Sequence, residues 1–385
     1  MSTRLTRAGL YQLVWSEPLR KLSKRFGISD VALAKRCRAA NIPLPGLGYW
    51  AKKEAGKPVF QPALPQRGFG QSDFIEFGPH ERRSYAEEDE ELLRTTLTPP
   101  EPFPDGLPEV MARARQIVGK VRASSSLAKP HPLVAKLLED DEQRREKQRS
   151  SPYPSFFDAP IFDSPFEERR LRFLNGLLLA VARAGGRASL RGKEGQELGV
   201  TIGDTHLSFT LGPLKPPRAT YSHKPLPAKE KMKLQLGWYE PPPEIRALWE
   251  DGDGQVLEDQ IEEIAASLFA YAEWAYRWGI QRRYENRVER KRELEERIRK
   301  QREEAERKER ARIEKKAAER RERLLSDAAA WRRASEIRAY VDAQIARWSV
   351  DVDAEALGAL QTWAEWALGQ ADQMDPLFGD PPKLG

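Results

Sequence analysis

FGISDVALAKRCRAANIPLPGLGYW, residues 26–50, is the stretch that decides the fold of the N-terminal part of this chain. Gly27 can take the left-handed turn conformation without steric cost, and Ser29 then offers a hydroxyl that caps a new helix. Leu33 and Cys37 fall on one face of that helix, and a proline soon afterwards forbids a long continuation. The stretch therefore predicts a tight turn followed by a short helix with one buried face.

Two further helices are expected before this turn. The first has an apolar face formed by Leu10, Leu13 and Val14. Ser16 and Pro18 mark the start of the second, because a hydroxyl caps a helix and proline is tolerated in its first turn. The second helix has an apolar side formed by Leu19, Leu22 and Phe26. Ser23 is small, which allows the second and third helices to cross closely at this point. The spacing of Ser23, Gly27 and Leu33 is that of a helix-turn-helix.

The net excess of positive charge lies in the same region. Residues 1–57 contain twelve Lys and Arg against three Asp and Glu, a net charge of +9, so the remaining 328 residues sum to −3. A positive field at one end of a chain is typical of a module that binds a polyanion. The alternative is a three-helix bundle that binds protein.

The expected partner is double-stranded DNA, with the third helix in its major groove. Lys35 and Arg38 are expected to point toward bases or the groove edge. Phosphates are the expected partners of Arg36, Lys21, Lys24 and Lys52. Asp30 is either a base-edge acceptor or a first-turn acid that complements the helix dipole. The predicted DNA-binding residues are Lys21, Lys24, Ser29, Asp30, Val31, Lys35, Arg36, Arg38, Lys52 and Lys53.

LPGLGYWAKKEAGK, residues 44–57, is expected to form a basic arm without a helix, because proline and glycine interrupt it. Tyr49 and Trp50 either cap the core or stack on bases.

Residues 13–58, LVWSEPLRKLSKRFGISDVALAKRCRAANIPLPGLGYWAKKEAGKP, resemble the N-terminal signature of a group of largely uncharacterised bacterial helix-turn-helix proteins. The module is also similar to those of bacterial regulators, resolvases, invertases and transposases. The resemblance implies DNA binding by the first domain and implies no activity for the rest of the chain.

The amino-acid composition changes twice in the middle of the chain. Residues 58–107 are rich in proline and include an acidic patch, which predicts a linker with at most short pieces of structure. A helical segment is expected over 108–150, with helices near 108–122 and 132–148. A small α+β domain is then expected over 151–256. It is predicted to contain a helix, strands at 187–191 and 233–240, and the hairpin LGVTIGDTHLSFTLG at 198–212, giving an antiparallel sheet with helices on one face.

No catalytic, cofactor-binding or metal-binding residue is predicted, and the chain is not expected to be an enzyme. GQELGVTIGD, residues 195–204, spaces its glycines like a phosphate loop but lacks the closing Gly-Lys-Ser/Thr. Cys37 is the only cysteine, which excludes an intramolecular disulfide. The histidines lack any local spacing of metal ligands, and they are His80, His131, His206 and His223.

A long charged helix is expected over 257–326. Residues 281–325 contain nineteen Lys and Arg and twelve Glu, without proline or glycine, and many Glu and basic residues lie four apart. Each such pair stabilises a helix by roughly 0.2–0.5 kcal/mol. The apolar residues do not hold a heptad, which favours a single solvated helix, or a poor dimer seam, over a regular coiled coil.

A helical hairpin is expected over 327–385. One helix carries Ile337, Val341, Ile345 and Trp348, and the other carries Leu357, Leu360, Trp363, Ala367 and Ala371. Two such helices bury little area, so the hairpin is expected to dock on a partner protein, on a second copy or on the charged helix.

The fold class expected is therefore mostly α with a small α+β domain. No apolar run is long enough to span a membrane and no signal peptide is visible, so a cytoplasmic or nucleoid-associated protein without membrane contact is expected. The expected function is DNA binding, in regulation or in association with mobile elements or plasmids. The alternatives are a scaffold or assembly protein that binds through its C-terminal helices, and an enzyme of DNA recombination or processing.

Overall fold

The computed structural model describes residues 3–78, 84–123, 126–153, 159–191, 197–215, 226–237, 239–252, 254–348 and 354–378. The chain is mostly helical, as the sequence predicts, and it divides into two compact units, Met1–Arg290 and Lys291–Gly385. Among the features predicted from the sequence, His80, His223 and the first two residues of GQELGVTIGD lie outside the described residues. None of the described helices has the length and apolar character needed to cross a membrane.

The N-terminal part of the first unit contains the three predicted helices and a strand pair that the sequence did not predict. The helices are α1 (Arg7–Ser16), α2 (Leu19–Arg25) and α3 (Asp30–Ala39). Strands β1 (Thr3–Thr6) and β2 (Phe74–Phe77) pair antiparallel. The N-terminal core also takes in Leu64, Ile75 and Phe77, so it reaches beyond the expected boundary at residue 57.

Most of the predicted local signals in this part are confirmed. Gly27 has φ +65°, and the Ser29 hydroxyl accepts a hydrogen bond from the Ala32 amide at 3.1 Å. The start of α2 differs from the prediction, because Ser16 belongs to the end of α1 and bonds back to the Leu13 carbonyl at 2.9 Å. Pro18 occupies the capping position itself, without a side-chain cap.

The segment after Pro45 was predicted to lack a helix, and that prediction is wrong. Helix α4 (Tyr49–Glu54) begins directly after Gly48, which has φ +77°. Glycine can reach this conformation without strain, so it allows the chain to turn into a helix here.

The described residues between 58 and 106 include two short elements, β2 and the ten-residue helix α5 (Tyr85–Arg94). A capping box between Ser84 and Glu87 fixes the start of α5. The acidic patch lies on this helix, where Asp89 pairs with Arg290 at 2.8 Å.

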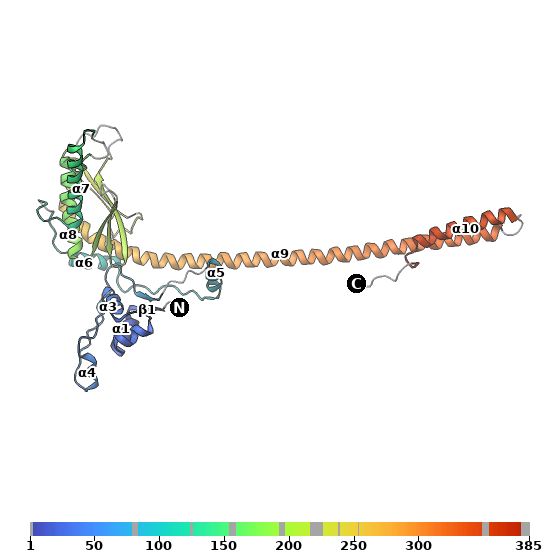
Figure 1. Ribbon diagram of the computed structural model, residues 1–385, viewed down its shortest axis with the longest axis horizontal. Helices are drawn as coiled ribbons and strands as arrows, with labels where there is room; N and C mark the ends of the chain where they lie inside the picture. Colours follow the sequence, from blue (N-terminus) through green and yellow to red (C-terminus); the bar gives the residue numbers. More distant parts are fainter. Residues whose placement is uncertain are drawn as a thin grey trace. The chain divides into compact units, whose positions relative to one another are not determined.

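The rest of the first unit is a layer of helices against an antiparallel sheet (Figure 1). The helices are α6 (Leu107–Val118), α7 (Pro132–Ser150) and α8 (Pro165–Arg183). The described strands lie in the order β3 (Arg187–Arg191), β4 (Glu197–Ile202), β5 (Thr205–Pro213), β6 (Met232–Leu236) and β7 (Leu248–Glu250). Strand β7 was not predicted, since three residues are too few to show a period.

One face of this sheet is buried and the other is more open. Leu207, Phe209 and Leu211 of β5 are buried, and the residues between them are partly or fully exposed. Strand β6 repeats the alternation with Met232, Leu234 and Leu236. The apolar face packs on α8 and on the first turns of the next long helix, as the predicted pattern requires.

That long helix, α9, runs from Ile261 to Trp348 after a short 3-10 turn at Leu257–Gln260. The predicted end near residue 326 is wrong, because no helix-breaking residue interrupts the chain there. Gly279 lies inside the helix, within the range 257–326 that was expected to be helical. The expected hairpin is therefore the last part of α9 with α10 (Ala354–Met374), around a small core of Val341, Ala364 and Ala367.

Candidate nucleic-acid interface

Helix α3 separates a buried face from a basic exposed face. Leu33 and Cys37 are fully buried in the N-terminal core, as predicted. Val31, Lys35 and Arg38 are exposed, and Val31 has 74% of its surface open to solvent. Residues spaced by four and then three lie in one stripe on a helix. The stripe therefore offers one aliphatic and two cationic side chains at the surface.

Two side chains at the start of α3 accept hydrogen bonds from backbone amides of its first turn. Ser29 caps the Ala32 amide, and the Asp30 carboxylate accepts from the Val31 amide at 2.9 Å. A negative group at this end complements the helix dipole. Asp30 therefore has the position of a first-turn acid, and the side chains of both Ser29 and Asp30 are exposed at the helix start.

Arg36 is held differently from the other basic residues of α3. Its guanidinium donates to the Glu76 carbonyl and lies 5.2 Å from the centre of the Phe77 ring. Phe77 in turn stacks on Phe26 at 4.5 Å between ring centres. Arg36 thus ties the side of α3 to strand β2, whereas it was predicted to point at phosphates.

The C-terminal end of α3 is held by side chains from distant segments. Arg7 is buried and donates to the carbonyls of Ala40 and Asn41 at 2.6 and 2.9 Å. Gln71 donates to the Ala39 carbonyl at 2.5 Å. These bonds supply donors to carbonyl groups that have no hydrogen-bond partner within the helix at its C-terminal end. Arg7 belongs to the +9 charge of the module, but its burial, which also lowers its pKa, removes it from the surface.

Gln71 belongs to a segment that we call the strap, residues 67–73. Arg67 at its start forms a two-pronged ion pair with Glu273 of α9, and one of the two hydrogen bonds measures 3.0 Å. Glu273 is completely buried and also accepts from the Gly70 amide at 2.9 Å and from Arg277 at 2.7 Å. Burial alone would lower the pKa of Arg67, but the hydrogen bond and charge of Glu273 outweigh it and raise the pKa.

The β4–β5 turn holds the strap from another side. The Asp204 amide and the Thr205 hydroxyl both donate to the Gly70 carbonyl, at 3.1 and 2.8 Å. The Asp204 carboxylate accepts from the Ser72 amide at 2.8 Å. Gly203 has φ +60°, and a Cβ there would lie 2.4 Å from the Phe69 carbonyl oxygen. The strap therefore connects the end of α3 with both the sheet and α9.

The remaining predicted contacts lie on α2 and α4. Lys21 and Lys24 are exposed on α2, and Lys52 is exposed on α4. The Lys53 ammonium lies 5.2 Å from the centre of the Trp50 ring. The Tyr49 and Trp15 rings are nearly perpendicular, with their centres 5.0 Å apart. Tyr49 is buried in the N-terminal core, so it caps that core.

The sequence reasoning missed the strap, although one signal for it was present. Glu273 is the only charged residue between Glu263 and Arg277, in an otherwise apolar stretch of helix. An isolated acid on a buried face requires a partner, because an unpaired buried charge is costly. The partner, Arg67, lies 206 residues away and could not be identified from spacing.

Comparison of this chain with protein-family models, with curated proteins and with solved structures finds no match.

Proposed function

We propose that this protein binds double-stranded DNA through α2, the turn at Gly27 and α3, with α3 in the major groove. The observation that carries the proposal is the stripe of Val31, Lys35 and Arg38. These side chains are exposed on a helix whose opposite face is buried and whose two ends are held. A rigid helix with exposed cations suits a groove lined by phosphates and base acceptors.

The charge pattern supports the same proposal. All ten predicted contact residues are exposed, although Arg36 is engaged with β2. Lys35 and Arg38 are then the candidates for base edges, since Lys and Arg bind the O6 and N7 acceptors of guanine. Lys21, Lys24 and Lys52 are the candidates for phosphates, which fix the position of the protein without reading sequence.

A double substitution tests the proposal. Lys35→Ala with Arg38→Ala should lower affinity for the best duplex site by at least about tenfold, since a good base contact contributes about 1–3 kcal/mol. The matched control is Lys136→Ala with Lys229→Ala, which removes two exposed cations away from α3. It should change affinity by less than about threefold, because distant charges are largely screened at physiological salt. If both double variants bind as the wild type does, α3 is not the interface.

A further inference from the structure

The hairpin formed by the end of α9 with α10 packs Trp363 against its core but leaves three other large aromatic side chains exposed. The buried residues are Val341 and the alanines 334, 364, 367 and 371, all of them small. Tyr340, Trp348 and Trp366 have 58%, 54% and 63% of their surfaces exposed. Aromatic groups of this size dominate the energetics of cores and interfaces when they are covered.

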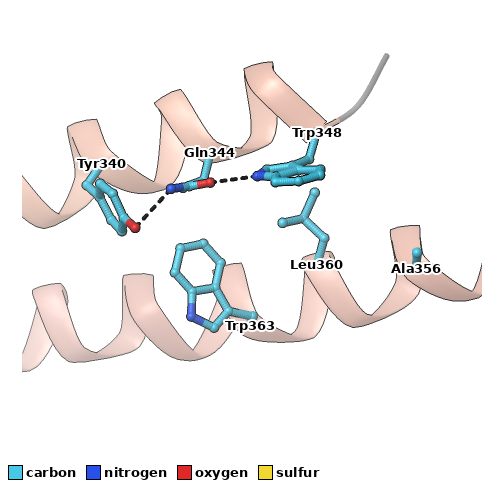
Figure 2. Close-up of a pocket in the computed structure, with 6 residues that line it drawn as sticks. All are labelled: Tyr340, Gln344, Trp348, Ala356, Leu360 and Trp363. Atoms are coloured by element: carbon cyan, nitrogen blue, oxygen red, sulfur yellow. Dashed lines mark hydrogen bonds between the residues drawn. The ribbon is translucent and has the colours of Figure 1, made fainter. Parts of the chain in front are cut away.

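Two of these aromatic residues belong to a groove. Figure 2 shows Tyr340, Gln344 and Trp348 in one row on α9, opposite Leu360 and Trp363 of α10. The groove encloses about 550 Å³, and its lining residues carry no formal charge. Gln344 bonds to the Tyr340 hydroxyl and to the Trp348 indole, each at 2.9 Å. The polar atoms of the wall are thus paired with each other, and the aromatic rings line the opening.

Trp366 lies about one helical turn beyond Trp363, which lines the groove. It follows Trp363 by three residues, which places the two side chains on neighbouring positions of the same helix surface. The hairpin therefore carries an exposed aromatic side chain and an aromatic groove within about two turns of each other. A two-fold axis can bring a projection of this kind on each copy to the groove of the other copy.

We propose that a second copy of this chain covers the groove, with Trp366 of each copy inserted between Trp348 and Trp363 of the other. The exposed parts of Tyr340, Trp348 and Trp366 amount to roughly 350 Å² if each side chain offers about 200 Å². A standard interface buries about 800 Å² per partner, somewhat more than half of it apolar. The three side chains supply most of that apolar area, and Leu360 and Trp363 add to it.

The charge of α10 favours this occupant over nucleic acid. The helix contains Glu355, Glu365 and Asp372 and no Lys or Arg. Asp372 is paired with Arg338 at 2.8 Å, which leaves the other two acids at the surface. The acids of α10 disfavour a polyanion on that helix. A cation near the groove is Arg347 of α9, whose guanidinium lies 5.7 Å from the centre of the Trp348 ring and can pair with an acid of the other copy's α10.

Sedimentation equilibrium of the full chain tests the proposal. The wild type should be a dimer at micromolar concentration, with twice the mass of 43.9 kDa. Trp366→Ala and Trp348→Ala should each weaken dimerisation by roughly thirtyfold or more, as expected of central tryptophans in an interface. Trp331→Ala is the matched control, since Trp331 is 49% exposed and lies nine residues before Tyr340, on the opposite side of α9.

Either of two results would overturn the proposal. One is a wild type that stays monomeric at these concentrations, in which case any groove occupant is another molecule. The other is a dimer whose dissociation constant is the same in Trp366→Ala, Trp348→Ala and Trp331→Ala. Circular dichroism of each variant shows whether helix content is retained. The mass of the wild type alone shows whether the chain forms a dimer.

Discussion

Arg67 and Glu273 form a two-pronged ion pair between residues 206 positions apart, and Glu273 has no surface exposed to solvent. The pair fixes the strap to α9, and Gln71 of the strap holds the last turn of α3. The candidate DNA-binding helix is therefore attached to the sheet domain through buried polar contacts.

Removing the acid from this pair should destabilise the first unit strongly. Glu273→Gln removes the negative charge that Arg67 and Arg277 share, and leaves them with Asp73 at 3.3 Å and Asp105 at 2.6 Å. Breaking a buried pair costs about 3–5 kcal/mol when the remaining charge has no other partner, so the expected loss is about 2–3 kcal/mol. The free energy of unfolding in urea, followed by tryptophan fluorescence, measures the effect.

The matched control for that substitution is Glu263→Gln. Glu263 pairs with Arg115 at 2.8 Å, and both side chains are well exposed. An exposed pair contributes about 0–1 kcal/mol. Equal losses in the two variants would show that burial of the Arg67–Glu273 pair has no energetic importance.

Gly203→Ala should destabilise the protein by more than Gly185→Ala. Both glycines have positive φ, which costs a residue with a Cβ about 1–2 kcal/mol. Only at Gly203 does the new Cβ also meet backbone, at the Phe69 carbonyl oxygen, whereas Gly185 has open space. Thermal unfolding of the two variants gives the comparison, and equal midpoints would contradict the packing of the turn on the strap.

The Cys37 thiol should make stability fall at alkaline pH. Burial raises the pKa of Cys37 from 9.0 to about 11, so between these values the unfolded chain loses a proton that the folded chain keeps. Stability linked to this group is then constant below pH 9 and decreases as pH rises toward 11, by up to about 2 kcal/mol. Urea unfolding at pH 8 and pH 10 should show a larger loss for the wild type than for Cys37→Ala. The same loss in both would mean that other groups cause it.

Val31→Ala should change which sequences are bound more than how stable the protein is. The side chain is largely exposed, and surface substitutions of this kind change stability by about 0.5 kcal/mol or less. In the major groove an aliphatic side chain contacts the methyl group of thymine. Loss of a thymine preference at one position of the selected sites is the expected result. An unchanged preference would place Val31 outside the base-reading surface.

Lys21→Ala with Lys24→Ala should weaken binding to all duplexes by the same factor. Phosphate contacts carry no sequence information, and each one lost should reduce the slope of log affinity against log salt by about 1. Binding titrations at several salt concentrations measure this slope. A change in the selected sequence, without a change in slope, would assign these lysines to bases.

Local signals predicted much of this fold, and contacts between distant segments account for most of what they missed. Gly27, Ser29 and the spacing of Leu33 and Cys37 predicted α3, because turn and cap preferences act within a few residues. Strand β1 gave no such signal, since its four residues become a strand only by pairing with β2 seventy residues later. The continuation of α9 past residue 326 has another cause, since the charge density of the chain falls there but no residue ends the helix.

For the candidate site too, local patterns predicted one part and contacts between distant segments determine the other. The stripe of Val31, Lys35 and Arg38 follows from helix period alone, and its exposure is confirmed. The fixation of Arg36 on β2 and the burial of Arg7 depend on residues 30 to 60 positions away. Formal charge therefore overstated the number of cations at the surface.

The central claim is that α3 reads DNA sequence, and selection of full-length protein on a random duplex pool across a salt series tests it most directly. Sequence reading by α3 should give enrichment of a short motif, affinity that falls steeply with salt, and loss of the enrichment in the Lys35→Ala, Arg38→Ala variant. Salt-sensitive binding without enrichment would contradict sequence reading, and absence of binding at low salt would contradict the proposed function as a whole.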